Sequence, residues 1–356
     1  MILLLLRRVF HPYSLLAYAS FIALVLICIY PKETIHAGLR GVYIWWEVLF
    51  PSLFPFFVLS ELLLGFGIVH FIGKLLDFLM KPVFRLPGIA GFVLTMGFIS
   101  GYPVAARLSA KLYEQNHITA KEAERLIGFT TTSDPIFLIG AVSIGFFHSY
   151  DLAILFAVVH YGTALLIGIT LGIHNRITSP DKHMLIKAST YKPSLFQAAI
   201  RAMVEAREGE TRSASRLFID AIFIATKLMI IVGGLVVFFS VILQLLTSTQ
   251  LLDFIISLLN LILYNIGLPE GFSQAIIPSL FEVTLGAKEA SIAPLATIHQ
   301  AAIAVWALSF AGFSVHAQIA SLLSHTPIRY LPFLKIRIVH ACIASLILYI
   351  VWPLFM

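Results

Sequence analysis

The chain has 356 residues, of which 59% are hydrophobic and 12% are charged, and its mean hydropathy is +0.95. Soluble globular domains carry about 25% charged residues, so these values exclude a soluble domain and indicate a polytopic membrane protein. The net charge of +6 does not indicate nucleic-acid binding, because membrane orientation itself requires basic residues beside apolar segments. Cys28 and Cys342 lie in apolar segments without a metal-ligand pattern, so neither a metal nor a cofactor is expected.

Long apolar runs predict about seven membrane-spanning helices, since a spanning helix needs about 20 residues. In chain order they lie near residues 13–30, 42–68, 125–148, 151–173, 217–246, 292–325 and 336–353. Arg7 and Arg8 precede the first run as they would in a signal peptide, but no small-residue cleavage site follows. The first run is therefore interpreted as a spanning helix.

The distribution of basic residues predicts the orientation. Segment 174–216 contains eight Lys or Arg residues, whereas the connection 148–151 contains none. Because Lys and Arg concentrate in cytoplasmic loops, the long segment and the N-terminus are predicted to be cytoplasmic and the C-terminus external. The predicted organisation is an N-terminal helix with an external loop (1–40), a first repeat (41–173), a basic cytoplasmic connector (174–216) and a second repeat (217–356).

Two further apolar segments, 89–115 and 270–289, have too few apolar residues on either side of an interruption to span a membrane. Each is predicted to be a re-entrant helical hairpin that enters and leaves on one side. The first is interrupted at Ser100-Gly101-Tyr102-Pro103, and the second between Pro278 and Glu282. An odd number of predicted crossings separates the hairpins, so the halves should form an inverted repeat whose tips meet near the midplane.

A second break follows each hairpin tip at the same distance. It lies 32 residues after Gly101 at Ser133, within the run Thr130 to Pro135, and 32 residues after Glu282 at Ser314. Unwound backbone inside a membrane is tolerated only where it lines a cavity, so paired breaks of this kind indicate the binding site of a secondary transporter.

The residue types at the breaks suit an anionic or polar ligand. Gly101 and Pro103 permit a reversal followed by a helix N-terminus, whose free amides attract carboxylates, although a Pro-kinked helix would also explain them. Asp134 inside a span is a functional candidate by default, and Arg107 requires either an acidic side chain or an anionic substrate as its partner. The candidate substrate-binding residues are Ser100, Gly101, Tyr102, Pro103, Arg107, Thr130, Thr131, Thr132, Ser133, Asp134, Glu282, Ser314 and His316.

The histidines and the absence of catalytic motifs favour transport over catalysis. His160, His299 and His340 are interpreted as packing residues, whereas His316 falls in a break. The sequence has no His-Glu-x-x-His, Gly-x-Ser-x-Gly or Walker motif, and we therefore expect no enzyme. An intramembrane hydrolase is the weaker alternative.

Several motifs resemble the YlbJ-type (SpoVV) sporulation integral membrane proteins of the nucleoside-recognition gate family. They are Phe50-Pro51-Ser52-Leu53-Phe54-Pro55-Phe56-Phe57, Gly97-Phe98-Ile99-Ser100-Gly101-Tyr102-Pro103, Glu122-Ala123-Glu124-Arg125-Leu126 and Phe129-Thr130-Thr131-Thr132-Ser133-Asp134-Pro135. The gate domain is similar to the hairpin core of concentrative nucleoside transporters, which implies the same all-α inverted repeat. The family pattern commonly has Asn where this chain has Asp134.

The resemblance implies a multi-pass protein of the outer forespore membrane that delivers dipicolinic acid to the developing spore. A pyridine with two carboxylates suits the helix N-termini and Arg107 inferred above. We therefore expect a carrier for a small organic dicarboxylate, with the lipid bilayer, a coupling ion and a partner membrane protein as candidate partners. The alternatives are a nucleoside, nucleobase or ion transporter and a non-transport spore-envelope assembly protein.

Overall fold

The structure, a computed structural model, describes residues 12–178, 194–265, 267–269 and 271–355. Every regular element within these ranges is a helix, which confirms the predicted all-α class. The interpretation of Arg7 and Arg8, and the basic residues of the connector between 179 and 193, lie outside the described residues.

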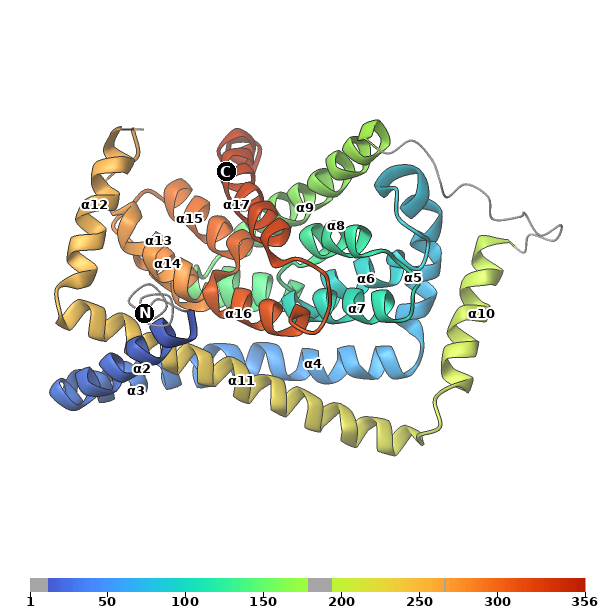
Figure 1. Ribbon diagram of the computed structural model, residues 1–356, viewed down its shortest axis with the longest axis horizontal. Coiled ribbons are helices and arrows are strands. Elements are labelled where there is room, and N and C mark those ends of the chain that lie inside the picture. The colour runs from blue at the N-terminus through green and yellow to red at the C-terminus, as the bar shows by residue number, and fades with distance from the viewer. Residues whose placement is uncertain (1–11, 179–193, 266, 270, 356) are drawn as a thin grey trace, which may run out of the picture.

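Figure 1 shows the helices coloured in chain order. In chain order they are α2 (Pro12–Ile29), α3 (Pro31–Ile44), η1 (Trp45–Leu49), α4 (Phe50–Gly65), α5 (Ile68–Leu79), η2 (Met80–Phe84), α6 (Ala90–Ser100), α7 (Tyr102–Glu114), α8 (Ala120–Thr130), η3 (Phe137–Phe146), α9 (Asp151–Thr178), α10 (Leu195–Glu208), α11 (Ala214–Ser248), α12 (Leu251–Asn265), α13 (Phe272–Phe281), α14 (Val283–Ile292), α15 (Thr297–Phe310), α16 (Gly312–Leu323) and α17 (Tyr330–Phe355).

The two halves have the same order of elements. Apart from η2, the helices from α4 to α9 correspond one by one to those from α11 to α17. In each half a long helix is followed by a shorter one, a hairpin (α6–α7 or α13–α14), a broken helix (α8–η3 or α15–α16) and a long closing helix. This order is the one that the spacing of the breaks predicts for a repeat.

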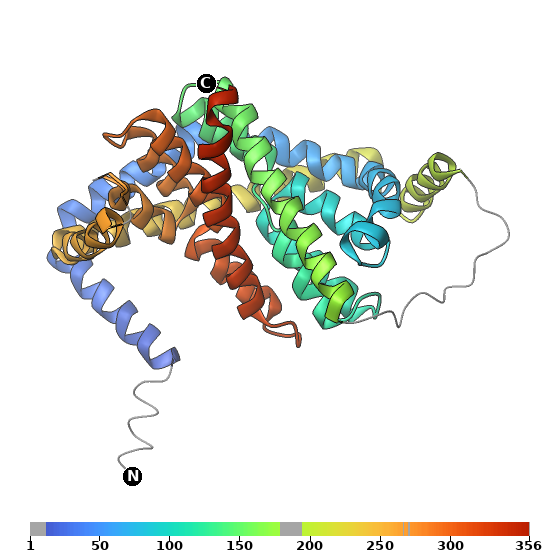
Figure 2. The ribbon, with the colours of Figure 1, turned by 90° about the horizontal axis from the view of Figure 1, so that it is seen from above.

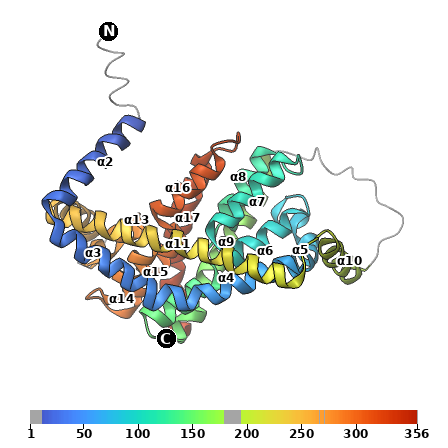
Figure 3. The same ribbon diagram turned by 90° about the horizontal axis from the view of Figure 1, so that it is seen from below.

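Two pairs of long helices frame the molecule. The closing helices α9 and α17 lie side by side (Figure 2). Helices α4 and α11 also lie side by side and run across them along one edge (Figure 3). Corresponding helices of the two halves are therefore paired, and the hairpins and broken helices lie between the pairs.

The number of candidate spans is lower than predicted. Four helical stretches of the described residues are long and apolar enough to cross a membrane, or up to six if each of two bent pairs is one span. The span expected at 125–148 is divided into α8 and η3, each too short to cross alone. The span expected at 13–30 continues after a bend of 106° into the helix that begins at Pro31. Pro31 and the polar run 131–134 therefore interrupt two of the predicted spans.

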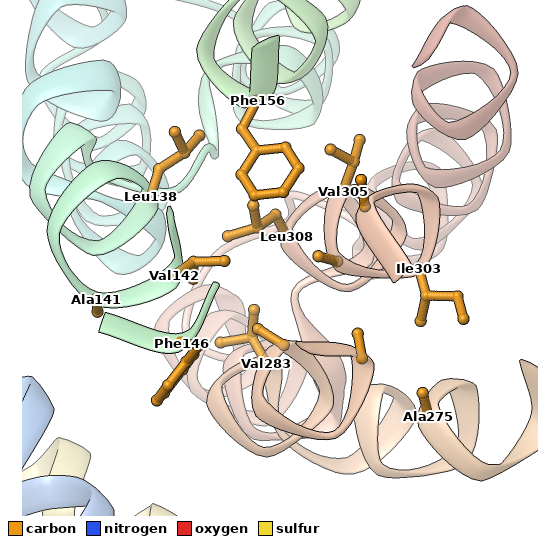
Figure 4. Packing of buried hydrophobic residues seen from close by; sticks show 14 of the residues in the cluster. Leu138, Ala141, Val142, Phe146, Phe156, Ala275, Val283, Ile303, Val305 and Leu308 are labelled. Atoms are coloured by element: carbon orange, nitrogen blue, oxygen red, sulfur yellow. The ribbon is translucent and has the colours of Figure 1, made fainter. Parts of the chain in front are cut away.

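Two large apolar clusters contain residues of both halves, and the larger lies around η3 and α15. Leu138 of η3, Phe156 of α9 and Leu308 of α15 are fully buried in it (Figure 4). Phe146 of η3 and Val283 of α14 pack in the same cluster. The ends of the broken helices are therefore held in a closely packed environment, where a displaced side chain is costly.

An ion pair outside the spans fixes the start of α17. Glu124 on α8 accepts hydrogen bonds from Arg329 Nε at 2.8 Å and Nη2 at 2.9 Å, and from the Arg329 backbone N–H at 3.1 Å. The Arg329 side chain thereby holds the pKa of Glu124 below its ordinary value. A lowered folded-state pKa stabilises the protein above the unfolded-state pKa, and this stability is lost as the pH falls through the folded-state value.

We therefore predict that Glu124→Gln slightly lowers the unfolding temperature at neutral pH. The difference from wild type should shrink as the pH falls below the unfolded-state pKa of about 4.3, and it should disappear once the pH is below the lowered folded-state pKa of Glu124. Thermal unfolding of both proteins in detergent across this pH range measures it, with Glu114→Gln as the control because Glu114 is exposed on α7. A difference that persisted unchanged at acid pH would contradict the prediction.

Candidate functional site

All four predicted breaks are present. The chain leaves the helix at Gly101 between α6 and α7, at 131–134 between α8 and the helical turn that leads into η3, at Glu282 between α13 and α14, and at Ala311 between α15 and α16. Nearly all residues at these breaks are buried, so the sequence located the irregular backbone of the interior correctly.

In the first half, the two breaks pack directly on each other. Gly101 has φ +82°, and a Cβ added there would lie 3.3 Å from Oδ2 of Asp134. Asp134 Oδ1 accepts a hydrogen bond from the Phe137 backbone N–H at 2.8 Å. The carboxylate thus caps the helix that follows its own break and lies beside the residue that starts α7.

The second half repeats this arrangement with the two residue types exchanged. Here the hairpin carries the carboxylate, because Glu282 is the N-cap of α14 and accepts the Leu285 backbone N–H at 2.9 Å. The glycine is in the other break, where Gly312 has φ +68° and a Cβ would lie 3.0 Å from the Glu282 Cα. Each half therefore places one buried acidic residue against one glycine with a positive φ, through the carboxylate of Asp134 in the first half and through the backbone of Glu282 in the second.

The hydroxyl run before Asp134 has mixed roles. Thr130 Oγ1 donates to the Leu126 carbonyl of its own helix, and Thr132 Oγ1 donates to the Gly97 carbonyl at 3.3 Å. The Thr131 hydroxyl is buried and has no hydrogen-bond partner within the described part of the chain. Ser133 Oγ donates to the Asp134 carbonyl at 3.4 Å. Only Thr131 therefore has an unused hydroxyl.

An arginine that the sequence analysis did not select connects the two halves. Arg337 on α17 is 0% exposed, and its guanidinium donates to the carbonyls of Thr131, Leu308 and Ser309. These carbonyls belong to the C-terminal ends of α8 and α15. In the described residues Arg337 forms no ion pair with a carboxylate, and its Nε has no hydrogen-bond partner.

Two histidines extend this network. The Ser133 N–H donates to His160 Nε2 at 3.1 Å, so the proton of this neutral ring is on Nδ1, which donates to Ser309 Oγ at 2.9 Å. His340, one turn after Arg337, donates from Nε2 to the His160 carbonyl at 3.0 Å. The two rings stack with their centroids 5.0 Å apart. These residues join the break of each half to the closing helices.

His316 has both ring nitrogens occupied. Its Nε2 donates to the Phe310 carbonyl at 2.9 Å, and its Nδ1 therefore accepts from the Tyr330 hydroxyl at 2.7 Å. The ring closes the end of α15 onto the start of α17, which is a structural contact. Ser314 is also buried. The break was predicted at Ser314, but both residues lie in the first turns of α16 and the chain leaves the helix three residues earlier, at Ala311.

The first hairpin tip is attached to the second half. Tyr102 is buried, and its hydroxyl donates to the Leu308 carbonyl at 2.8 Å. Ser100 and Pro103 flank it with partial exposure. Arg107 is exposed on α7 and interacts electrostatically with Glu61 on α4. The structure therefore places Tyr102 among the buried residues at the breaks, whereas Arg107 lies on the surface.

The sequence analysis did not select Arg337, because the last span was predicted to begin at residue 336, beside it. The helix begins instead at Tyr330, which places Arg337 two turns inside an apolar helix. The signal available in the sequence was the i, i+3 spacing of Arg337 and His340, which puts two polar residues on one face of that helix.

Comparison with known proteins agrees with this architecture. A Gate family model, described as nucleoside recognition, matches residues 46–162. The sporulation integral membrane protein YlbJ of Bacillus subtilis (strain 168) is 40% identical over 327 residues, which cover 92% of this chain and 79% of that protein. The chain belongs to the YlbJ family.

The expected resemblance is thus confirmed, and the chain is an integral membrane protein of a sporulation family. An uncharacterised protein of Alkalihalophilus pseudofirmus is 36% identical over 66 residues, or 18% of this chain and 14% of that protein. No solved structure matches the chain. The Gate match includes both breaks of the first half, and the YlbJ match is long enough to include breaks of both halves.

Proposed function

We propose that this YlbJ-family chain is a carrier that moves a small organic dicarboxylate, with dipicolinate as the first candidate, by alternating access at the four breaks. The observation that carries the proposal is the convergence of broken helices from both halves on Arg337. Non-helical backbone at membrane depth is tolerated only inside protein or around a cavity, and transporter sites are built from broken helices.

The chemistry of the breaks supports an anionic substrate. Arg337 has no carboxylate partner among the described residues and one unused N–H. The N-cap of α7 is Gly101, which has no capping side chain, so this helix end favours a carboxylate beside it. The name of the Bacillus relative places that protein in sporulation, and we propose the outer forespore membrane as the location of this chain.

A nucleoside carrier is the second candidate. The Gate model that matches residues 46–162 is described as nucleoside recognition. Buried carboxylates such as Asp134 and Glu282 accept hydrogen bonds from ribose hydroxyls or base N–H groups as readily as they accept backbone N–H groups. We propose no catalytic role for these residues, because neither is paired with a nucleophile and an activating base.

Uptake of labelled dipicolinate by proteoliposomes that contain the purified full-length protein tests the proposal. We expect saturable uptake that exceeds uptake by empty liposomes, that isophthalate inhibits, and that uridine and adenosine leave unchanged. Picolinate, with one carboxylate, should compete only weakly. Saturable uptake of a nucleoside without uptake of dipicolinate would establish the second candidate, and uptake of neither would favour a role in spore-envelope assembly.

A further inference from the structure

Three buried residues with charged side chains lie at the breaks. Each is next to helix ends whose partial charge is opposite to its own. Asp134 is 7% exposed, Glu282 is 5% exposed and Arg337 is 0% exposed. Within the described ranges none of them forms an ion pair. A helix end carries roughly half an elementary charge, positive at the N-terminus and negative at the C-terminus. The helix ends around each side chain therefore decide its charge balance.

Arg337 faces two C-terminal ends. Its guanidinium contacts the last carbonyls of α8 and the last turn of α15. Two ends of about half a negative charge each offset the single positive charge of the guanidinium. The arginine is thus neutralised by backbone dipoles, and it is not available to neutralise either carboxylate.

Each acidic residue lies next to two N-terminal ends. Asp134 caps the helix that continues into η3 and lies beside Gly101, the residue before α7. Glu282 caps α14, and its backbone contacts Gly312, the first residue of α16. In either half one of these ends is capped by the carboxylate and the other adjoins the same residue, and two ends of about half a positive charge each offset one ionised carboxylate.

Taken together, Asp134, Glu282, Arg337 and the helix ends around them are therefore close to neutral when both carboxylates are ionised. A dicarboxylate that bound there would add two negative charges to a region with no remaining positive charge to receive them. The effective cost of burying each uncompensated charge is several kcal/mol. A neutral Asp134 or Glu282 would instead leave its two helix ends free for one carboxylate of the substrate.

We propose that the carrier is a proton symporter in which Asp134 and Glu282 each take up one proton for each carboxylate of the bound substrate. This inference rests on the proposed dicarboxylate function. On the entry side, one proton from water adds to each carboxylate oxygen as the dianion binds. Both protons leave with the dianion on the other side, so each cycle moves about two protons and no net charge.

Other titratable groups surround the two carboxylates. Tyr102 on α7 interacts with both, and Tyr161 on α9 interacts with Asp134. The His160 ring on α9 accepts a hydrogen bond from the Ser133 N–H, and Arg337 on α17 donates to the carbonyl of Thr131. His316 on α16 is next to the Gly312 break and has both nitrogens bonded. His160 and His316 each have both ring nitrogens bonded. We therefore assign the proton exchange to the two carboxylates.

Proton movement during dipicolinate uptake tests the inference. Proteoliposomes that contain the full-length protein and an internal pH dye receive external dipicolinate, and the membrane potential is set with potassium and valinomycin. We expect an inward proton gradient to drive accumulation, the lumen to acidify by about two protons per substrate, and the rate to be independent of membrane potential. Saturable uptake without proton movement would overturn the inference and leave the dicarboxylate carrier standing. Absence of uptake at every pH would overturn the dicarboxylate function, and the proton coupling with it.

Asparagine and glutamine variants assign the protons to residues. Asp134→Asn and Glu282→Gln should each reduce the ratio to about one proton per substrate, so that a negative interior slows uptake. Glu289→Gln is the matched control, because Glu289 is an exposed carboxylate on α14, and it should keep the wild-type ratio. A ratio of about two in either single variant would exclude that residue.

A second measurement on the wild-type protein applies if a variant does not fold. A hydrophobic carbodiimide modifies protonated buried carboxyls, and mass spectrometry locates the modified residues. We expect modification of Asp134 and Glu282 at acid pH and protection of both by dipicolinate. Modification elsewhere, with these two residues untouched, would contradict the assignment.

Discussion

Arg337→Met is expected to lower the free energy of unfolding by more than about 3 kcal/mol, because the buried carbonyls of Thr131 and Ser309 lose their side-chain donor. The guanidinium bonds these carbonyls and that of Leu308 at the ends of α8 and α15, and Leu308 keeps the Tyr102 hydroxyl as a second donor. Methionine fills a similar volume but donates no hydrogen bond, and the two negative helix ends would then face each other without a cation. Unfolding in mixed detergent micelles, followed by circular dichroism, measures the loss.

Two further variants separate the hydrogen bonds from the charge. Arg337→Lys retains the charge but donates from one nitrogen atom, so we expect it to recover only part of the stability. Lys335→Met is the control on the same helix, since Lys335 is exposed, and it should change the stability by less than about 0.5 kcal/mol. If Arg337→Met were as stable as Lys335→Met, the arginine would not hold the two broken helices together.

The positions of the breaks were predictable because the residues that cause them act locally. Gly101 and Gly312 adopt a positive φ, and Pro135 disfavours helix at Asp134, the residue before it. Their equal spacing in the two halves also predicted the repeat. The ends of the long helices were less predictable, because apolar composition does not distinguish a span from a bent pair such as α2 and α3.

The partners of the buried groups could not be predicted, since they come from distant parts of the sequence. Arg337 bonds to Thr131, 206 positions away, and Tyr102 bonds to Leu308 at the same separation. Hydropathy placed His160 and His340 in apolar helices, but only the packing of α9 against α17 stacks their rings. The sequence analysis selected Arg107 because it lies one turn after the tip, yet its side chain is exposed.

Close packing within the hairpins leads to a second large effect, at Gly286 on α14. A Cβ there would lie 2.2 Å from Ser279 Oγ and 2.3 Å from Ser279 Cα on α13. The second contact is with backbone, so no change of side-chain rotamer relieves it. Ser279 is itself held by its hydrogen bond to the Ala275 carbonyl at 2.7 Å. An added methyl group must therefore move the two helices of the hairpin apart.

We predict that Gly286→Ala destabilises the protein by about 2–3 kcal/mol through overpacking and slows transport because the hairpin carries Glu282 at its tip. Gly162→Ala is the matched control in α9, since no atom lies within 4 Å of the added methyl group. That substitution should be neutral or stabilise the protein by up to about 1 kcal/mol, because alanine favours a helix interior over glycine. Thermal unfolding and dipicolinate uptake of both variants measure the contrast. Equal stability of the two variants would mean that α13 and α14 are not packed as closely as described, and normal uptake by Gly286→Ala would separate the hairpin from the transport cycle.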